Sequence, residues 1–225
     1  MATKTKNPAQ RLLIIDDHPM MRNGLAQLID SEGDLKVTGQ ADNAGQAIDL
    51  VTKQKFDLVL CDISLPDKNG LELIKDIRAL RSELPILVVS MHDEMIYAER
   101  VLRAGGRGYI MKQEGGEKFI RAIRQVLSGQ IFVSDKMSSR ILEIFSGGNK
   151  KKTDDSPVSR LSDREFEVFQ LIGHGKGTRD IAEQLHLSVK TVEVHRANIK
   201  EKLNLQTATE LVRFAVRWAD SEGSK

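Results

Sequence analysis

Short apolar runs alternate with amphipathic segments over the first 128 residues of the chain. Five of the runs are too short for helices and rich in Leu, Ile and Val, which is typical of strands buried on both faces. They are Arg11–Asp16, Lys36–Ala41, Asp57–Asp62, Pro85–Ser90 and Gly108–Met111. Periodic apolar positions predict five helices, at Pro19–Asp30, Ala44–Lys53, Leu71–Leu80, Glu94–Ala104 and Glu117–Ser128. Five strand–helix units in succession predict a doubly wound α/β domain with a five-stranded parallel sheet.

The pattern changes towards the C-terminus. Residues 146–160 contain Gly-Gly, the run Lys150–Lys152 and a proline, which indicates a flexible linker. We interpret the three lysines as solvent-exposed charges of this linker rather than as DNA-binding residues. A capping box of Ser162 and Glu165 then begins a run of helices that continues with Thr178–His186, Val189–Leu203 and Ala208–Ala219. We therefore predict one domain at residues 1–130, a linker with a short helix at 131–159, and a small all-α domain at 160–225.

Composition and charge narrow the class of protein. The chain has 225 residues, of which 40% are hydrophobic and 29% charged, as in ordinary globular proteins. No apolar run is long enough to cross a bilayer, and the lone cysteine, Cys61, excludes an internal disulfide, so we expect a cytoplasmic protein. Residues 1–128 carry 18 Lys and Arg against 18 Asp and Glu, and residues 159–225 carry 11 against 10. Net charge therefore does not indicate nucleic-acid binding in either region.

Polar residues gather at the carboxyl ends of the predicted strands, where sheets of this class bind ligands. Asp16 and Asp17 end the first strand, Asp62 ends the third, Ser90 ends the fourth and Lys112 follows the fifth. A single strand-end aspartate is most simply a cap of the following helix, but that explanation does not account for all five positions together. Crowded carboxylates repel one another, and an all-oxygen site with few protein ligands is suited to Mg²⁺.

Such a cluster can take part in phosphoryl chemistry. A carboxylate beside Mg²⁺, a lysine and a hydroxyl can attack phosphorus, because the assembly neutralises the charge on the phosphoryl group in transfer. The neighbouring His18 is more readily interpreted as a residue at the start of a helix than as a metal ligand.

These residues and their surroundings resemble the receiver domain of two-component response regulators, a flavodoxin-like fold. The matching stretches are Ile15–His18, Asp62–Gly70, Val89–Ser90 and Tyr109–Lys112, and the resemblance covers residues 11–128. It implies that Asp62 accepts a phosphoryl group from a sensor histidine kinase. It also implies that Asp16, Asp17, Asp62 and the backbone carbonyl of Ser64 hold Mg²⁺, that Ser90 and Lys112 contact the phosphoryl group, and that Tyr109 is the aromatic switch residue.

The chain departs from the receiver pattern at two positions. Gln113 stands after Lys112 where many receivers have proline, and Met91 stands after Ser90 where many have a small residue. The larger side chain at position 91 predicts narrower access to Asp62 and slower phosphoryl exchange.

The predicted helix Val189–Leu203 has an unusual outward face. Val192, Ile199 and Leu203 form its core stripe, whereas the opposite face mixes polar residues with Val194 and Ala197. This pattern fits two explanations equally well: a helical bundle with two small apolar surface residues, or the second helix of a helix-turn-helix, which enters the DNA major groove.

A second resemblance favours the DNA-binding interpretation. Leu161–Glu165, Ile181–Ala182 and Ser188–His195 are similar to the LuxR-type helix-turn-helix of the NarL/FixJ response regulators, over residues 160–220. The candidate DNA contacts are base-edge or phosphate contacts from one face of the helix and its start. They are Ser188, Lys190, Thr191, Glu193, Val194, Arg196, Ala197, Asn198 and Lys200.

The last predicted helix carries two apolar stripes. Leu211, Phe214, Ala215 and Trp218 form one, and Ala208, Val212, Val216 and Ala219 form the other. The second stripe indicates either a homodimer interface or a wide core face. The resemblance implies dimers on paired DNA half-sites about one helical turn apart.

The sequence thus predicts a DNA-binding transcriptional regulator that is switched by phosphorylation of Asp62, with RNA polymerase as a further candidate partner and without enzymatic activity on other substrates. Two alternatives remain. An aspartyl-phosphate phosphatase or phosphotransferase is disfavoured because such enzymes require a second Asp two positions after the nucleophile, where this chain has Ser64. A constitutive DNA binder with a non-switching receiver is disfavoured by the complete acidic pocket.

Overall fold

A computed structural model describes residues 8–145 and 157–223, and the chain divides into two compact units, Met1–Gly148 and Asn149–Lys225. These are called the N-terminal unit and the C-terminal unit below. The predicted linker lysines, Lys150–Lys152, lie outside the described residues.

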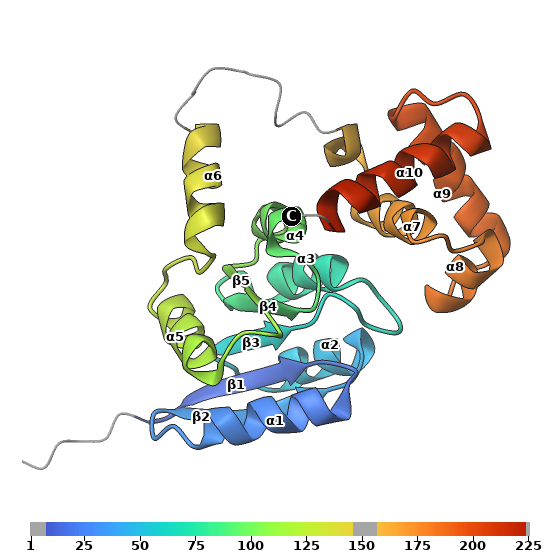
Figure 1. Cartoon of the computed structure of the whole chain (residues 1–225). Coiled ribbons are helices and arrows are strands. Elements are labelled where there is room, and N and C mark those ends of the chain that lie inside the picture. The colour runs from blue at the N-terminus through green and yellow to red at the C-terminus, as the bar shows by residue number, and fades with distance from the viewer. Residues whose placement is uncertain (1–7, 146–156, 224–225) are drawn as a thin grey trace, which may run out of the picture. The chain divides into compact units, whose positions relative to one another are not determined.

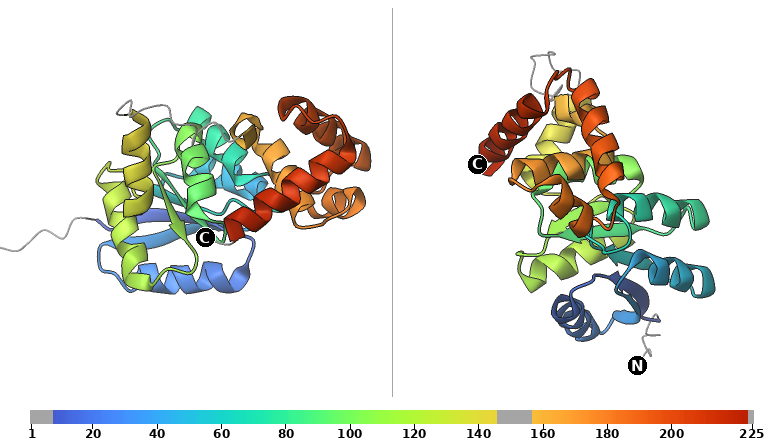
Figure 2. Two further views of the ribbon diagram at one scale, coloured as in Figure 1. Left: turned by 45° about the horizontal axis from the view of Figure 1, so that its top comes forward. Right: turned by 90° about the vertical axis from the view of Figure 1, so that its right-hand side faces the viewer.

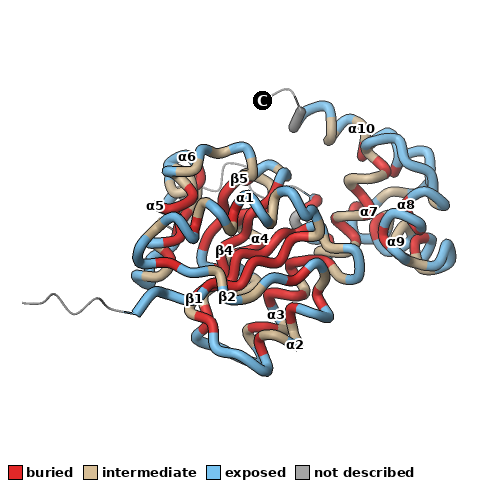
Figure 3. Tube along the Cα trace, turned by 90° about the horizontal axis from the view of Figure 1, so that it is seen from below, coloured by how far each residue is buried: buried red, intermediate tan, exposed pale blue. Residues whose placement is uncertain are grey.

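The N-terminal unit is built on one parallel sheet of five strands (Figure 1). The strands are β1 (Gln10–Ile15), β2 (Leu35–Ala41), β3 (Leu58–Cys61), β4 (Ile86–Ser90) and β5 (Gly108–Met111), in the order β2-β1-β3-β4-β5. Every strand begins and ends within one residue of its predicted bounds. The predicted five-stranded parallel sheet is therefore confirmed, and β3 and β4 are buried along their whole length (Figure 3).

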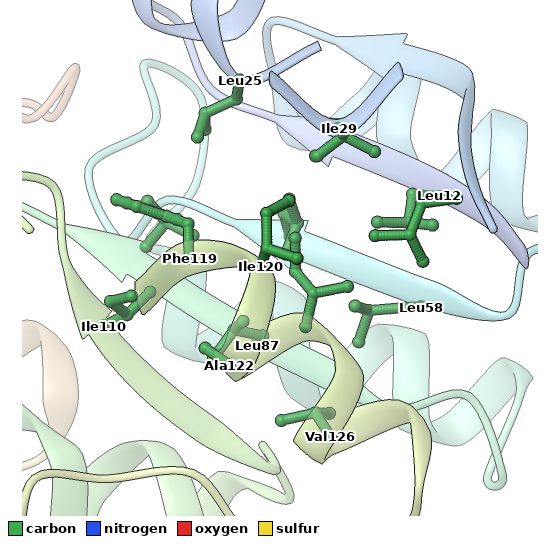
Figure 4. Packing of buried hydrophobic residues seen from close by; sticks show 14 of the residues in the cluster. Leu12, Leu25, Ile29, Leu58, Leu87, Ile110, Phe119, Ile120, Ala122 and Val126 are labelled. Carbon is green, nitrogen blue, oxygen red and sulfur yellow. The ribbon is translucent and has the colours of Figure 1, made fainter. Parts of the chain in front are cut away.

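Helices cover both faces of this sheet (Figure 2). They are α1 (Pro19–Asp30), α2 (Ala44–Lys53), α3 (Gly70–Leu80), α4 (Glu94–Ala104) and α5 (Gly116–Leu127). On one face, Leu25 and Ile29 of α1 and Phe119 of α5 pack on strand residues such as Leu12 and Leu87 (Figure 4). The helices α2, α3 and α4 lie on the other face, as right-handed crossovers require.

The chain after α5 also packs on the N-terminal unit. The Tyr109 amide donates to the Phe132 carbonyl at 2.8 Å, which extends the edge of the sheet beyond β5. The Glu94 carboxylate accepts from the Ser134 amide at 2.7 Å, and α6 (Asp135–Phe145) then packs against α4 with Met137 fully buried. The region 131–159, for which the sequence predicts a linker with a short helix, thus contains a helix of 11 residues, and Phe132 and Met137 bury against the sheet edge and α4.

The C-terminal unit consists of helices. The short 3₁₀ helix η1 (Pro157–Arg160) precedes α7 (Asp163–Gly173), α8 (Thr178–Gln184), α9 (Val189–Lys202) and α10 (Ala208–Gly223), and α7 packs against both α9 and α10. Ser162 and Glu165 form the predicted capping box. The prediction that one helix reaches His186 is wrong, because His186 adopts a left-handed backbone with φ of 51° and ends the helical geometry.

Among the residues described, none of the helices combines the length and the apolar character needed to cross a membrane.

Glu165 ties the first helix of the C-terminal unit to α9. Its side chain is only 6% exposed, accepts from the Ser162 amide at 2.8 Å and pairs with Lys202 at 2.6 Å. Burial alone would raise the pKa of this carboxyl, but the hydrogen bonds from Lys202 and Ser162 outweigh it and hold the pKa below its ordinary value. Ionised Glu165 therefore stabilises the unit above the unfolded pKa of about 4.3, and this stabilisation is lost as the pH falls through the lower, folded value.

We expect Glu165→Gln to lower the free energy of unfolding of the C-terminal unit by about 1–2 kcal/mol at pH 7. The difference from wild type should disappear as the pH falls below about 4. Urea unfolding followed by the fluorescence of Trp218 measures this, because Trp218 is the only tryptophan in the chain and contacts Phe166 and Phe169 of α7. A difference that stays constant from pH 7 to pH 3 would contradict the assigned role of the carboxylate.

Candidate functional site: an acidic pocket and the outward face of α9

The parallel topology brings the strand-end polar residues together. Because β1, β3, β4 and β5 are neighbours in the sheet and run in the same direction, their carboxyl ends meet at one edge. Asp16, Asp62 and Ser90 are buried there, and Asp17 is partly exposed. The side chain of Lys112, which follows β5 directly, is 4% exposed.

Lys112 connects two of the carboxylates. Its ammonium nitrogen lies 2.7 Å from Asp16 Oδ2 and 2.8 Å from Asp62 Oδ2. Burial raises the pKa of Asp62, and the Lys112 charge counteracts that rise. Burial alone would lower the pKa of Lys112, but the two carboxylates outweigh it and hold the pKa above its ordinary value. The pocket therefore contains a fixed positive charge beside Asp62.

The acidic cluster has the donor atoms that a hard divalent cation needs. Asp16, Asp17, His18 and Asp62 each offer one ligand atom, and these atoms all lie within 4.8 Å of one another. Asp17 Oδ1 is buried, lies 2.7 Å from His18 Nδ1 and accepts no hydrogen bond, so it is placed to bind a cation. Carboxylate oxygens around a partly open site match the ligand preference of Mg²⁺. The residues present therefore fit the predicted ion.

Ser90 and Tyr109 both hydrogen-bond to the backbone of His92 in the loop after β4. Ser90 Oγ accepts from the His92 amide at 3.2 Å, and the Tyr109 hydroxyl donates to the His92 carbonyl at 2.7 Å. The His92 ring lies 3.0 Å from Ser64 Oγ, two residues beyond Asp62, and stacks on Tyr97. His92 is not among the site residues predicted from the sequence, where its only signal is its position two residues after Ser90. The side chain of Met91, which the sequence predicts to narrow access to Asp62, is 58% exposed.

The loop between β3 and α3 holds Asp62 in place through its own hydrogen bonds. The Ser64 amide donates to Asp62 Oδ1 at 3.3 Å, and Asn69 caps α3 by accepting from the Leu71 amide. Asp67 accepts from two amides at the start of α2, those of Ala44 and Gly45, at 2.8 and 2.9 Å. Asp67 and Asn69 are not among the site residues predicted from the sequence, although the Asp67–Gly70 stretch is a typical turn before a helix.

The second candidate site is the outward face of α9. Val192 and Ile199 are fully buried against the rest of the C-terminal unit, and Ser188 begins the helix by accepting from the Thr191 amide. Val194 is 51% exposed although it is apolar. The exposed members of the predicted DNA-contact set are Ser188, Lys190, Glu193, Val194, Ala197 and Asn198, while Thr191, Arg196 and Lys200 are partly buried at the margins.

The two predicted stripes of α10 differ in burial. Leu211 and Ala215 are fully buried, and Phe214 and Trp218 contact the aromatic side chains of α7. On the other stripe, Ala208 and Val212 are exposed, whereas Val216 and Ala219 are intermediate. The second stripe is therefore not fully covered by the C-terminal unit itself.

Comparison with known families divides the chain in the same way. The profile of the response regulator receiver domain matches residues 12–124, and that of the bacterial regulatory proteins of the luxR family matches residues 159–215. The protein named oxygen regulatory protein NreC from Staphylococcus haemolyticus is 36% identical over 212 residues, which cover 92% of this chain and 97% of that protein. Its namesake from Staphylococcus carnosus is 35% identical over 211 residues, with the same coverage.

Solved structures agree with this relation. A LuxR-family two-component response regulator from Aurantimonas is 30% identical, with a TM-score of 0.57, over 61% of this chain and 99% of that chain. RcsB from Salmonella enterica serovar Typhimurium, bound to the promoter rprA in the presence of the phosphomimetic BeF3⁻, is 25% identical with a TM-score of 0.63. That match covers 92% of this chain and 98% of RcsB.

Proposed function

Because the chain belongs to the response regulators that join a receiver domain to a LuxR-type DNA-binding domain, we propose that phosphorylation of Asp62 by a sensor histidine kinase switches its binding to DNA. The chain is a DNA-binding response regulator of the NarL/FixJ group. The observation that carries the proposal is the buried Lys112 ammonium, which lies 2.8 Å from Asp62 at the carboxyl end of β3.

In the proposed reaction Asp62 is the nucleophile. A carboxylate oxygen of Asp62 forms a bond to phosphorus while the bond between phosphorus and the kinase imidazole nitrogen breaks, and that nitrogen keeps the electron pair. Lys112 already pairs with Asp62 and remains beside the transferred group, where its charge offsets the negative charge on the phosphoryl oxygens.

Asp16, Asp17 and Asp62, with the backbone carbonyl of Ser64, would hold Mg²⁺ in this pocket. When bound, the ion neutralises charge on the phosphoryl oxygens and relieves the repulsion between the carboxylates. The Asp17 oxygen that accepts no hydrogen bond and the position of all three carboxylates within one small cluster support this assignment.

The same pocket supplies a switch. Ser90 and Lys112 would contact the phosphoryl oxygens. Ser90 Oγ would then lose its hydrogen bond from the His92 amide and bond to the phosphoryl group instead. Because Tyr109 donates to the carbonyl of that same His92, movement of the loop changes the position of the Tyr109 ring. A shift from a 1:99 to a 99:1 population requires about 5.5 kcal/mol of differential stabilisation.

In the C-terminal unit we propose that α9 reads the major groove. Lys190 and Glu193 would contact base edges, Val194 would meet a thymine methyl, and Arg196 and Lys200 would hold phosphates. Two copies would bind paired half-sites as a homodimer through the incompletely covered stripe of α10, formed by Ala208, Val212, Val216 and Ala219.

The remaining assignments follow from this function. We assign the receiver to residues 1–130, the connection to 131–159 and the DNA-binding domain to 160–225. We further propose that the protein acts in the cytoplasm, that RNA polymerase is a partner, and that its only covalent chemistry is phosphorylation and self-dephosphorylation of Asp62.

The test is DNA affinity as a function of phosphorylation. The full chain first selects its DNA from a random pool, and fluorescence anisotropy then measures binding at one fixed salt concentration, with and without acetyl phosphate and MgCl₂. We expect phosphorylation to increase the affinity about tenfold or more, within the usual range of coupling between two sites. Equal affinity in the two states would favour a constitutive binder instead.

Val194→Asp is the matched variant for the DNA side of this experiment. The substitution places a negative charge on the exposed face of α9, where it repels the DNA backbone, and leaves the buried stripe of the helix intact. We expect normal phosphorylation with DNA binding reduced to the non-specific level. Retention of specific binding by this variant would contradict the assignment of α9 as the reading helix.

A further inference from the structure

The side chain of His18 points into the carboxylate cluster at the end of β1. Its ring nitrogen Nδ1 lies 2.7 Å from Asp17 Oδ1 and 3.4 Å from Asp16 Oδ1. His18 is the residue before α1, and its side chain makes no cap hydrogen bond to that helix. The side chain is 68% exposed, so its orientation follows from its contacts with the two carboxylates rather than from packing or helix capping.

The contact between His18 and Asp17 does not have the geometry of a hydrogen bond. Asp17 Oδ1 is buried and has no hydrogen-bond partner even though the ring nitrogen is 2.7 Å away. The two atoms are therefore close without being directed at each other. Two adjacent ligands of an octahedral ion also lie close together without a hydrogen bond between them. Metal–ligand bonds of about 2.1 Å at right angles place neighbouring ligand atoms about 3 Å apart. The 2.7 Å between His18 Nδ1 and Asp17 Oδ1 is close to that separation. Asp16 Oδ1, which lies 3.4 Å from the same nitrogen, also accepts from the His18 amide at 2.8 Å.

We propose that His18 Nδ1 is a ligand of the receiver metal site, beside Asp16, Asp17 and Asp62, and that it gives the site a preference for imidazole-binding transition-metal dications over Mg²⁺. A site made only of oxygen ligands suits Mg²⁺, whereas an added imidazole nitrogen favours ions such as Mn²⁺ and Co²⁺. The inference rests on the metal site of the proposed function and adds a fourth side chain to it.

The variant that tests this is His18→Phe, which keeps an aromatic ring and removes the ligand nitrogen. Because the side chain is largely exposed and caps nothing, the fold should be unaffected. Calorimetric titration of the untagged full chain with Mg²⁺ and with Co²⁺ gives the two affinities. We expect Co²⁺ to bind wild type more tightly than Mg²⁺, and His18→Phe to weaken Co²⁺ binding about tenfold or more while changing Mg²⁺ binding less than about twofold.

A spectroscopic measurement identifies the ligand directly. Electron spin-echo modulation of Mn²⁺ bound to the wild-type chain should contain the ¹⁴N coupling of a coordinated imidazole, and His18→Phe should lack it. His92→Phe is the matched control, because it removes the other imidazole near Asp62. The His92 ring hydrogen-bonds to Ser64 and lies outside the cluster of Asp16, Asp17, His18 and Asp62. The ¹⁴N coupling should persist in that variant.

The outcomes separate this inference from the proposed function. Mg²⁺ binding without ¹⁴N coupling, or with equal effects of His18→Phe on both metals, overturns the role of His18 and leaves the Mg²⁺ site intact. Failure of wild type to bind any of the three ions overturns the metal site itself. Loss of the coupling in His92→Phe rather than in His18→Phe would assign the nitrogen to His92 and refute the proposal.

Discussion

Replacement of Asp62 by asparagine is expected to abolish phosphorylation of the protein by acetyl phosphate. Asparagine has nearly the same shape, but its neutral amide cannot act as the nucleophile towards phosphorus. The folded state should tolerate the change, because Asp62 is buried, burial raises its pKa, and Lys112 keeps its second partner Asp16. Phos-tag electrophoresis after treatment with acetyl phosphate and Mg²⁺ measures the result, with a shifted band for wild type and none for Asp62→Asn.

Asp67→Asn is the matched control for this experiment. Asp67 lies in the same loop, but its carboxylate accepts from the amides of Ala44 and Gly45 at the start of α2 and, within the described part of the chain, makes no hydrogen bond or ion pair with Asp62 or Lys112. We expect its band to shift as in wild type. A shifted band for Asp62→Asn would refute Asp62 as the acceptor. Loss of the shift in Asp67→Asn alone would indicate that loop geometry, rather than the nucleophile, limits the reaction.

Gly70→Ala is expected to unfold much of the N-terminal unit. A Cβ atom at this position would lie 2.3 Å from the carbonyl oxygen of Asp62 and 2.6 Å from Cα of Ile63. Both atoms belong to the backbone, so rotation of a side chain cannot relieve the overlap, and the loop that carries Asp62 must move. We expect a loss of about 3 kcal/mol or more in the free energy of unfolding, together with impaired phosphorylation.

Hydrogen–deuterium exchange of the β3 peptide reports this loss in the full chain, because β3 lies in the middle of the sheet and exchanges only when the unit opens. Gly24→Ala is the matched control. Gly24 lies on the exposed side of α1 with no atom within 4 Å of the added methyl group, so this change should stabilise the unit by about 0.5–1 kcal/mol. Similar exchange rates in the two variants would contradict the close backbone packing at Gly70.

The secondary structure of the N-terminal unit could be predicted because its determinants are local. The helices Pro19–Asp30, Ala44–Lys53 and Glu94–Ala104 have the bounds that the sequence predicted, since Pro19 at the first helical position and the caps Asn43 and Asp93 are signals in the chain itself. The meeting of Asp16, Asp62, Ser90 and Lys112 followed from one further rule, that parallel strands with helical crossovers end at the same edge of a sheet.

Other features depend on contacts between residues that are distant in the chain. The packing of α6 on α4 required that Phe132 join the edge of β5 and that Glu94 accept from Ser134, 40 residues away. The Gly-Gly pair, the lysine run and the proline of residues 146–160 indicate a linker, and the sequence predicts a short helix within 131–159. Only the burial of Phe132 and Met137 against a surface built elsewhere shows that this helical part is folded onto the unit.

For this protein, the sequence by itself determined the element order, the parallel sheet, the polar residues at its edge and the amphipathic helices of the second unit, because hydrophobic periodicity and capping act within a few residues. The tertiary structure alone decided the direction of the His18 ring towards Asp17 and the hydrogen bond from the Tyr109 hydroxyl to the His92 carbonyl. It also decided the close approach of the Asp62 and Ile63 backbone to Gly70. These depend on side-chain rotamers and on backbone separations of a few ångströms, which are set by packing among elements that have already formed.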